Sequence, residues 1–127
     1  MKFVPMALLP LALIAGCAST PVPALHGVAH ARLGETAYVD GPKVTPLQVI
    51  EDSRCPAKVD CVWAGRLRIS VRIDLGSGSQ TRELTLGEPQ HVADGSLELV
   101  EATPYPVAGK TIEPGDYRFG LRFMGGL

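Results

Sequence analysis

The stretch from Glu51 to Gly65, E-D-S-R-C-P-A-K-V-D-C-V-W-A-G, contains two of the three cysteines of the chain and its only tryptophan. Five residues separate Cys55 from Cys61, and Pro56 favours a turn directly after the first cysteine. We therefore predict a disulfide that closes a short loop between two β-strands. The alternative is a pair of metal-binding or redox-active thiolates, but zinc sites usually have shorter cysteine spacings and need two further ligands.

Three residues close to the cysteines are expected to support this loop. Trp63 follows Cys61 by two residues, and residues two apart in an extended chain share a face, so we expect the indole to cover the disulfide. Gly65 is expected to permit a bulge or a close backbone approach. We expect Asp52 to accept hydrogen bonds from backbone N–H groups of the turn rather than to bind a ligand.

The motif from Asp52 to Gly65, D-S-R-C-P-x4-C-V-W-A-G, resembles a signature of small bacterial secreted or lipid-anchored proteins, a group without an assigned activity. The motif residues besides the cysteines include Asp52, Arg54, Pro56, Trp63 and Gly65. The resemblance implies a β-domain of the cell envelope. It supplies no catalytic residue.

The N-terminus resembles the signal of a bacterial lipoprotein. Lys2 precedes an uncharged, mostly apolar run from Phe3 to Ala15, which is shorter than the roughly 20 residues of a membrane span and suits a signal-peptide core. The following L-I-A-G-C string resembles a lipobox and implies cleavage after residue 16 and lipidation of Cys17. The alternative is an ordinary signal peptide in which Cys17 is incidental. Ala18 resembles the sorting pattern of lipoproteins on the outer membrane, where the protein would face the periplasm.

The remaining chain is expected to form a tether and one domain. Pro21 and Pro23 disfavour regular structure, so we assign residues 17–33 to the lipidated cysteine and a flexible tether, and residues 34–127 to a single β-domain. His26 and His30 have the spacing of a helical metal pair, but no third ligand is nearby. We interpret them as solvated histidines, with transition-metal capture as the alternative. After cleavage, 11 Lys and Arg face 13 Asp and Glu, which argues against nucleic-acid binding.

Period-two alternation of apolar and polar residues predicts the fold. It is strictest over residues 66–75, where the odd positions are apolar and the even positions are polar, as in a strand with one buried face. Further strands are predicted at residues 36–39, 44–52 (with Leu47 and Val49 inward), 80–86, 90–93, 96–102 (with a bulge at Val100) and 116–123. Six to seven short strands without a convincing helix predict an all-β fold, either a small antiparallel β-sandwich or a partly open barrel.

The sequence contains no nucleophile elbow, zinc-protease motif or phosphate-binding loop, so we predict neither an enzyme nor a cofactor or metal site. The best surface candidate is a set of outward-facing arginines. Arg66, Arg68 and Arg72 share one face of a strand, and Arg118 and Arg122 would extend it if the last strand lies in the same sheet. Such a face would bind phosphate or carboxylate groups of envelope polymers. An ordinary solvated sheet face is the alternative.

Together these patterns predict a lipid-anchored binding or structural module of the cell envelope without catalytic activity. Its expected partners are the membrane, through the N-terminal lipid, and an envelope protein or polymer. The alternative is a metal- or redox-active periplasmic protein that uses Cys55, Cys61 and the histidines.

Overall fold

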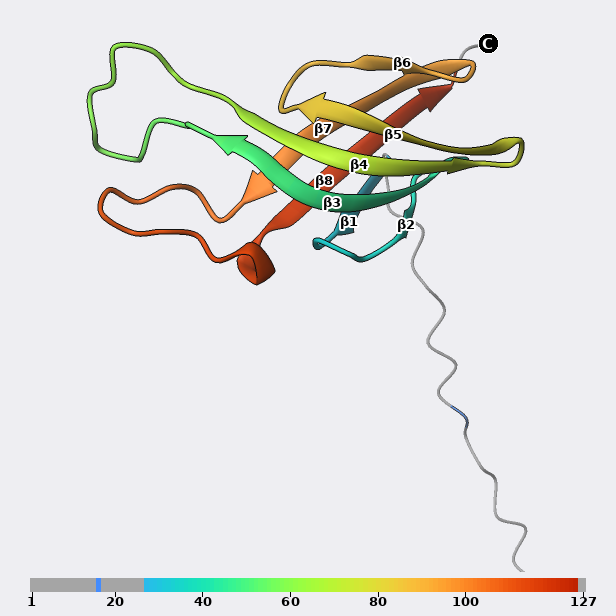
Figure 1. The fold of residues 1–127 in the computed structure, drawn as a ribbon, viewed down its shortest axis with the longest axis horizontal. Coiled ribbons are helices and arrows are strands. Elements are labelled where there is room, and N and C mark those ends of the chain that lie inside the picture. The colour runs from blue at the N-terminus through green and yellow to red at the C-terminus, as the bar shows by residue number, and fades with distance from the viewer. Residues whose placement is uncertain (1–15, 17–26, 126–127) are drawn as a thin grey trace, which may run out of the picture.

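The computed structural model describes residue 16 and residues 27–125. Two four-stranded antiparallel sheets pack face to face, with the strand orders β1-β8-β7-β6 and β2-β3-β4-β5 (Figure 1). The strands are β1 (Val28–Ala31), β2 (Ala37–Tyr38), β3 (Lys43–Asp52), β4 (Leu67–Leu75), β5 (Gly78–Thr85), β6 (Gln90–Val92), β7 (Gly95–Thr103) and β8 (Arg118–Gly125). The all-β prediction is confirmed, and of the two expected architectures the structure shows the sandwich.

The core consists of the apolar sides of the two sheets. On β4 the odd-numbered side chains from Leu67 to Ile73 are fully buried, as the alternation predicts. On β8 the buried face carries Phe119, Leu121 and Phe123, and Tyr117 directly before the strand is also buried. One sheet therefore contributes mainly aliphatic and the other mainly aromatic and leucine side chains to a shared core.

The register confirms one predicted irregularity and corrects another prediction. The β7–β8 ladder shifts between Leu99 and Glu101, which is the bulge expected at Val100. The β3–β4 ladder also shifts, between Pro46 and Gln48, and Leu47 is 45% exposed. The prediction that Leu47 points inward is therefore wrong, because the extra residue of a bulge reverses the faces of the residues beside it. Proline lacks the N–H group that a regular ladder needs, which explains an irregularity next to Pro46.

The first strand begins earlier than expected. Residues Val28–Ala31 form β1 and pair with β8, from Val28 opposite Arg122 to Ala31 opposite Phe119. The assignment of this segment to a flexible tether is therefore wrong, and the domain includes it. Residues 1–15 of the expected signal peptide, Cys17, His26 and most of the tether lie outside the described residues. Within residues 27–125 no helix is long and apolar enough to cross a membrane.

Two long connections project from the same end of the sandwich (Figure 1). One is the cysteine loop, residues 53–66, between β3 and β4. The other is the proline loop, residues 104–117, between β7 and β8, which ends in a short 3-10 turn at Pro114–Asp116. We call this end of the domain the loop end. The sandwich thus brings together two loops that are distant in sequence.

Candidate functional site

The predicted disulfide is present. Cys55 and Cys61 are joined by an S–S bond of 2.11 Å with a Cα–Cα distance of 6.0 Å. Because the two sulfurs are bonded to each other, neither is available as a thiolate ligand in this structure. Over the described residues, no three His, Cys, Asp or Glu side chains are grouped to hold a metal ion. His30 lies on a strand, where the helical spacing to His26 does not apply.

Backbone hydrogen bonds extend the β3–β4 pairing into the base of the cysteine loop. The Ser53 N–H donates to the Arg66 carbonyl at 2.8 Å, and the Cys55 N–H donates to the Ala64 carbonyl at 3.0 Å. Gly65 has a φ of +69°, and a Cβ there would lie 1.7 Å from the Ser53 carbonyl oxygen. The predicted close backbone approach at Gly65 is confirmed. The two sides of the loop therefore meet too tightly at its base for any side chain at this position.

Arg54 connects the cysteine loop to the opposite sheet. Its side chain is 93% buried and donates from Nε and Nη2 to the Asp52 carboxylate at 2.8 and 2.9 Å. The same guanidinium donates to the Ala102 carbonyl at 2.8 Å and to the Pro104 carbonyl at 3.1 Å. The Tyr105 ring lies 5.6 Å from the guanidinium carbon. We call Arg54, Asp52 and Tyr117 the arginine clamp, because together they tie the base of one loop to the base of the other.

Asp52 is the centre of this clamp. It accepts a hydrogen bond from the Arg54 backbone N–H at 3.4 Å, which is the predicted turn role, and it also accepts the Tyr117 hydroxyl at 2.8 Å. Partial burial alone would raise the pKa of Asp52, but the hydrogen bonds from Arg54 and Tyr117 hold this pKa below its ordinary value of 3.8. Burial and the hydrogen bond to Asp52 raise the pKa of Tyr117 to about 12. The carboxylate is therefore ionised and the phenol is neutral at pH 7.

The two loops also contact each other beyond the clamp, since the Ala57 N–H donates to the Pro106 carbonyl at 3.3 Å. Several apolar side chains of these loops are exposed. They are Val59 (42%), Val62 (104%) and Trp63 (83%) on the cysteine loop, and Tyr105 (65%) and Val107 (52%) on the proline loop. The prediction that Trp63 covers the disulfide is wrong, because an indole exposed to this extent is not packed against it. We call these five side chains the apolar loop surface.

A hollow of about 510 Å³ lies beside Trp63. It is lined by Glu51, Ser53, Trp63, Ala64, Gly65 and Arg66. Glu51 accepts hydrogen bonds from Arg66 Nε at 2.9 Å and Arg68 Nε at 2.8 Å, and these bonds lower the pKa of Glu51, with Arg68 contributing most. The hollow thus combines a flat aromatic side chain with a carboxylate and a guanidinium at its border.

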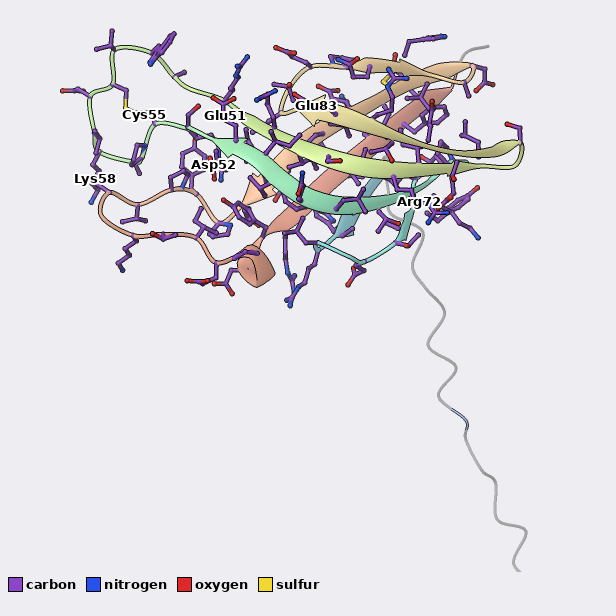
Figure 2. All side chains as sticks on the ribbon, in the orientation of Figure 1. Glu51, Asp52, Cys55, Lys58, Arg72 and Glu83 are labelled. Atoms are coloured by element: carbon purple, nitrogen blue, oxygen red, sulfur yellow. A yellow bond between two sulfur atoms is a disulfide. The ribbon has the colours of Figure 1, made fainter. Side chains whose placement is uncertain are left out.

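The five predicted surface arginines do not form one face. Arg66, Arg68 and Arg72 lie on or beside β4, whereas Arg118 and Arg122 lie on β8 in the other sheet, so the expected single patch is wrong in its extent. Four of the five also have carboxylate partners: Glu51 for Arg66 and Arg68, Asp74 for Arg72 and Glu98 for Arg122, while Glu83 also pairs with Arg68. Figure 2 shows Glu51 close to the cysteine loop and Arg72 toward the opposite end of the sheet.

The residues that sequence reasoning missed are those that join the two loops. Asp52 and Arg54 lie two apart and share a face in extended chain, which is a signal for their pairing. Nothing local to the motif indicates Tyr117, which lies 65 residues away, or the Ala102 carbonyl, which lies 48 residues from Arg54. Comparison of the chain with protein-family models, with curated proteins and with solved structures gave no match.

The disulfide leads to a stability prediction. Replacing both cysteines by serine is expected to lower the free energy of unfolding by about 2 kcal/mol while retaining the fold, because a short closed loop removes only modest entropy from the unfolded chain. Urea denaturation followed by circular dichroism measures this difference. Reduced wild-type protein should unfold at the same urea concentration as the double variant. A midpoint identical to that of the oxidised protein would show that the bond adds nothing to stability.

Tyr117 leads to a prediction about alkaline pH. Its pKa is higher in the folded protein, about 12, than the ordinary value of 10, so its stabilising effect is complete below pH 10 and is lost as the pH rises toward 12. Tyr117→Phe should lower the free energy of unfolding at pH 8 by about 1.5 kcal/mol, the contribution of a hydrogen bond to a charged group. The difference between the two proteins should narrow above pH 10. Urea denaturation at pH 8, 10 and 11 tests this, and a constant difference would contradict it.

Proposed function

We propose that the chain is a lipid-anchored binding module of the bacterial cell envelope, without catalytic activity, that presents its loop end to an envelope protein or polymer. The observation that carries the proposal is the exposure of Trp63 and Val62 on a loop held by a disulfide and the arginine clamp. Contiguous exposed apolar side chains are typical of interaction sites, and tryptophan is enriched among residues that dominate binding. Loops fixed on a rigid scaffold frequently carry such sites.

The rigidity of the loop end supports this proposal. The disulfide closes the cysteine loop, the Arg54 guanidinium bonds the carbonyls of Ala102 and Pro104, and Ala57 bonds Pro106. A loop that is already ordered loses little conformational entropy when a partner binds. The hydrogen bonds therefore favour a preformed binding surface over a segment that folds on its partner.

The direction of β1 is consistent with an N-terminal anchor. Its last residue, Ala31, pairs with Phe119 near the start of β8, and its first residue, Val28, pairs with Arg122 farther along. Since β8 follows the proline loop, β1 runs toward the loop end, and its first residue, Val28, lies farther from that end than Ala31 does. An anchor at Cys17 would thus leave the loop end free to face away from the outer membrane, into the periplasm.

Site-specific crosslinking in a bacterium with two membranes tests the proposed surface. A photoreactive amino acid at Val62 should give a discrete adduct, whereas the same group at Ser77, in the exposed turn between β4 and β5, should not. Adding Trp63→Ser should abolish the adduct at position 62. Equal labelling at both positions, or an adduct that survives Trp63→Ser, would overturn the proposed binding surface.

The anchor is tested separately. With Cys17→Ser, the chain should lose incorporation of labelled palmitate and leave the membrane fraction, while its thermal unfolding midpoint stays unchanged. Retention of the label in the variant would exclude lipidation at Cys17. A thiol titration of denatured, unreduced protein from the same cells distinguishes the binding module from a metal- or redox-active protein. A binding module is expected to show no free thiol at Cys55 and Cys61.

A further inference from the structure

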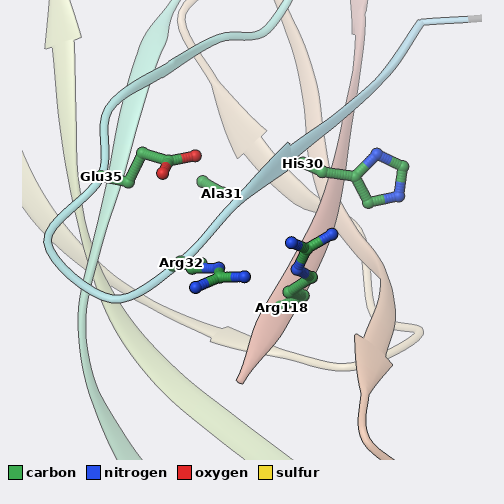
Figure 3. A pocket seen from close by; sticks show the side chains of 5 residues that line it. All are labelled: His30, Ala31, Arg32, Glu35 and Arg118. Atoms are coloured by element: carbon green, nitrogen blue, oxygen red, sulfur yellow. The ribbon is translucent and has the colours of Figure 1, made fainter. Parts of the chain in front are cut away.

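A second hollow, of about 310 Å³, lies where β1 ends and β8 begins. Its lining consists of His30, Ala31, Arg32, Glu35 and Arg118 (Figure 3). None of these residues belongs to the apolar loop surface or to the arginine clamp. Ala31 is buried, while His30, Arg32 and Arg118 are exposed, so the charged groups are accessible to a solute.

The end of the β1–β8 ladder brings two arginines to the same hollow. Ala31, the last residue of β1, pairs with Phe119, and Arg32 directly follows Ala31 while Arg118 directly precedes Phe119. Figure 3 shows both guanidinium groups at the same hollow. The fold therefore holds two cations together.

The neighbouring carboxylates do not neutralise this pair. Glu35 lines the hollow, yet within the described part of the chain neither Arg32 nor Arg118 has a carboxylate oxygen within 4.0 Å. Glu101 lies 3.5 Å from His30 Nε2. By contrast, Arg66, Arg68, Arg72 and Arg122 all make ion pairs. Two guanidinium groups that line one hollow without a carboxylate at bonding distance favour an external anion.

We propose that this hollow binds a phosphate group between Arg32 and Arg118. Each guanidinium presents a planar fork of N–H donors that matches the spacing of phosphate oxygens. An anion between the two forks would accept hydrogen bonds from both and offset their mutual repulsion.

The same chemistry has two sources, a free phosphate ion and the phosphodiester of a membrane headgroup. Arg32 follows Cys17 by 15 residues, and a chain of that length spans at most about 54 Å. A lipid at Cys17 would therefore hold the hollow within that distance of the headgroups. The headgroup source rests on the proposed anchor, whereas phosphate binding by Arg32 and Arg118 does not.

Titration of the full chain in a non-ionic detergent with two soluble probes tests this site. The probes are inorganic phosphate and glycerophosphoglycerol, the deacylated headgroup of phosphatidylglycerol, and NMR chemical shifts report binding. Saturable binding of glycerophosphoglycerol would identify a membrane headgroup as the ligand. Saturable binding of inorganic phosphate but not of glycerophosphoglycerol would identify the free phosphate ion as the ligand. If neither probe binds saturably, the proposal is overturned, whatever palmitate labelling shows at Cys17.

Four single substitutions establish where the probes bind. Arg32→Gln and Arg118→Gln should each weaken binding at least about tenfold, as expected for the loss of a charge-assisted bidentate contact. Glu35→Gln should strengthen binding, because it removes a carboxylate from the lining. Arg72→Gln, on the other sheet, is the matched control and should change the affinity less than twofold. Equal losses for Arg72→Gln and Arg118→Gln would show non-specific attraction and overturn the site.

Discussion

Arg54→Met is expected to lower the free energy of unfolding by about 3–5 kcal/mol, because removing one partner of a buried ion pair leaves the other charge uncompensated. Here Asp52, whose side chain is 12% exposed, would lose two hydrogen bonds from the Arg54 guanidinium, and the carbonyls of Ala102 and Pro104 would lose their donor. Methionine keeps much of the side-chain length, so the change tests the polar contacts rather than the loss of packing.

The matched control is Arg72→Met. Arg72 also pairs with an aspartate, at 3.2 Å from Asp74, but its side chain is 55% exposed. Exposed ion pairs contribute about 0–1 kcal/mol, so the control should unfold nearly as the wild-type protein does. Denaturation in urea at pH 7, followed by circular dichroism, measures both variants. Equal losses for Arg54→Met and Arg72→Met would show that the clamp adds no more stability than a surface pair.

A double variant separates the buried charge from the lost hydrogen bonds. Adding Asp52→Asn to Arg54→Met removes the carboxylate that Arg54→Met leaves unpaired. The double variant should therefore be less destabilised than the sum of the two single variants, because residues in one network are not additive. Additive losses would contradict the direct coupling of Asp52 and Arg54.

Gly65→Ala is expected to lower the free energy of unfolding by about 3 kcal/mol or more, which exceeds the cost of about 1–2 kcal/mol for a left-handed residue with a side chain. The added methyl group would lie 1.7 Å from the Ser53 carbonyl oxygen and 2.5 Å from its carbon, so the backbone at the base of the cysteine loop must move. That movement would weaken the bond from the Ser53 N–H to the Arg66 carbonyl, which is 2.8 Å long.

Gly87→Ala provides the control for backbone conformation alone. Gly87 has a φ of +84°, and an added Cβ would meet nothing within 4 Å. Gly87→Ala should therefore lower the free energy of unfolding by only about 1–2 kcal/mol, which is the cost of a left-handed backbone conformation for a residue with a side chain. Urea denaturation of both alanine variants measures the difference, which reports the steric contact with Ser53. Equal losses of stability for Gly65→Ala and Gly87→Ala would mean that the base of the cysteine loop moves away from the added methyl group at no energetic cost.

The losses of stability expected for Arg54→Met and Gly65→Ala explain why these residues occur in the motif from Asp52 to Gly65. Asp52 and Arg54 form the clamp, Cys55 and Cys61 close the loop, and Gly65 lets its two sides approach. Trp63 makes no contribution of this kind, because 83% of its surface is exposed. We therefore propose that Trp63, exposed beside Val62, contacts a partner.

Local patterns in the chain are sufficient to predict the strands with long alternation and the disulfide. Alternation over residues 66–75 requires a face buried against another layer, and the spacing and turn chemistry around Cys55 and Cys61 are local properties of the chain. The bulge at Val100 could also be predicted from the local pattern, because this residue breaks the alternation of apolar and polar positions.

Which strands and side chains contact one another depends on how the whole chain folds. The four residues of β1 are too few to show a period, and they form a strand because β8 supplies the partner for their backbone groups. The division of the arginines between two sheets and the reach of Arg54 to Ala102 depend on pairings between distant segments. Such contacts follow from how the sheets pack, which no local pattern of residues specifies.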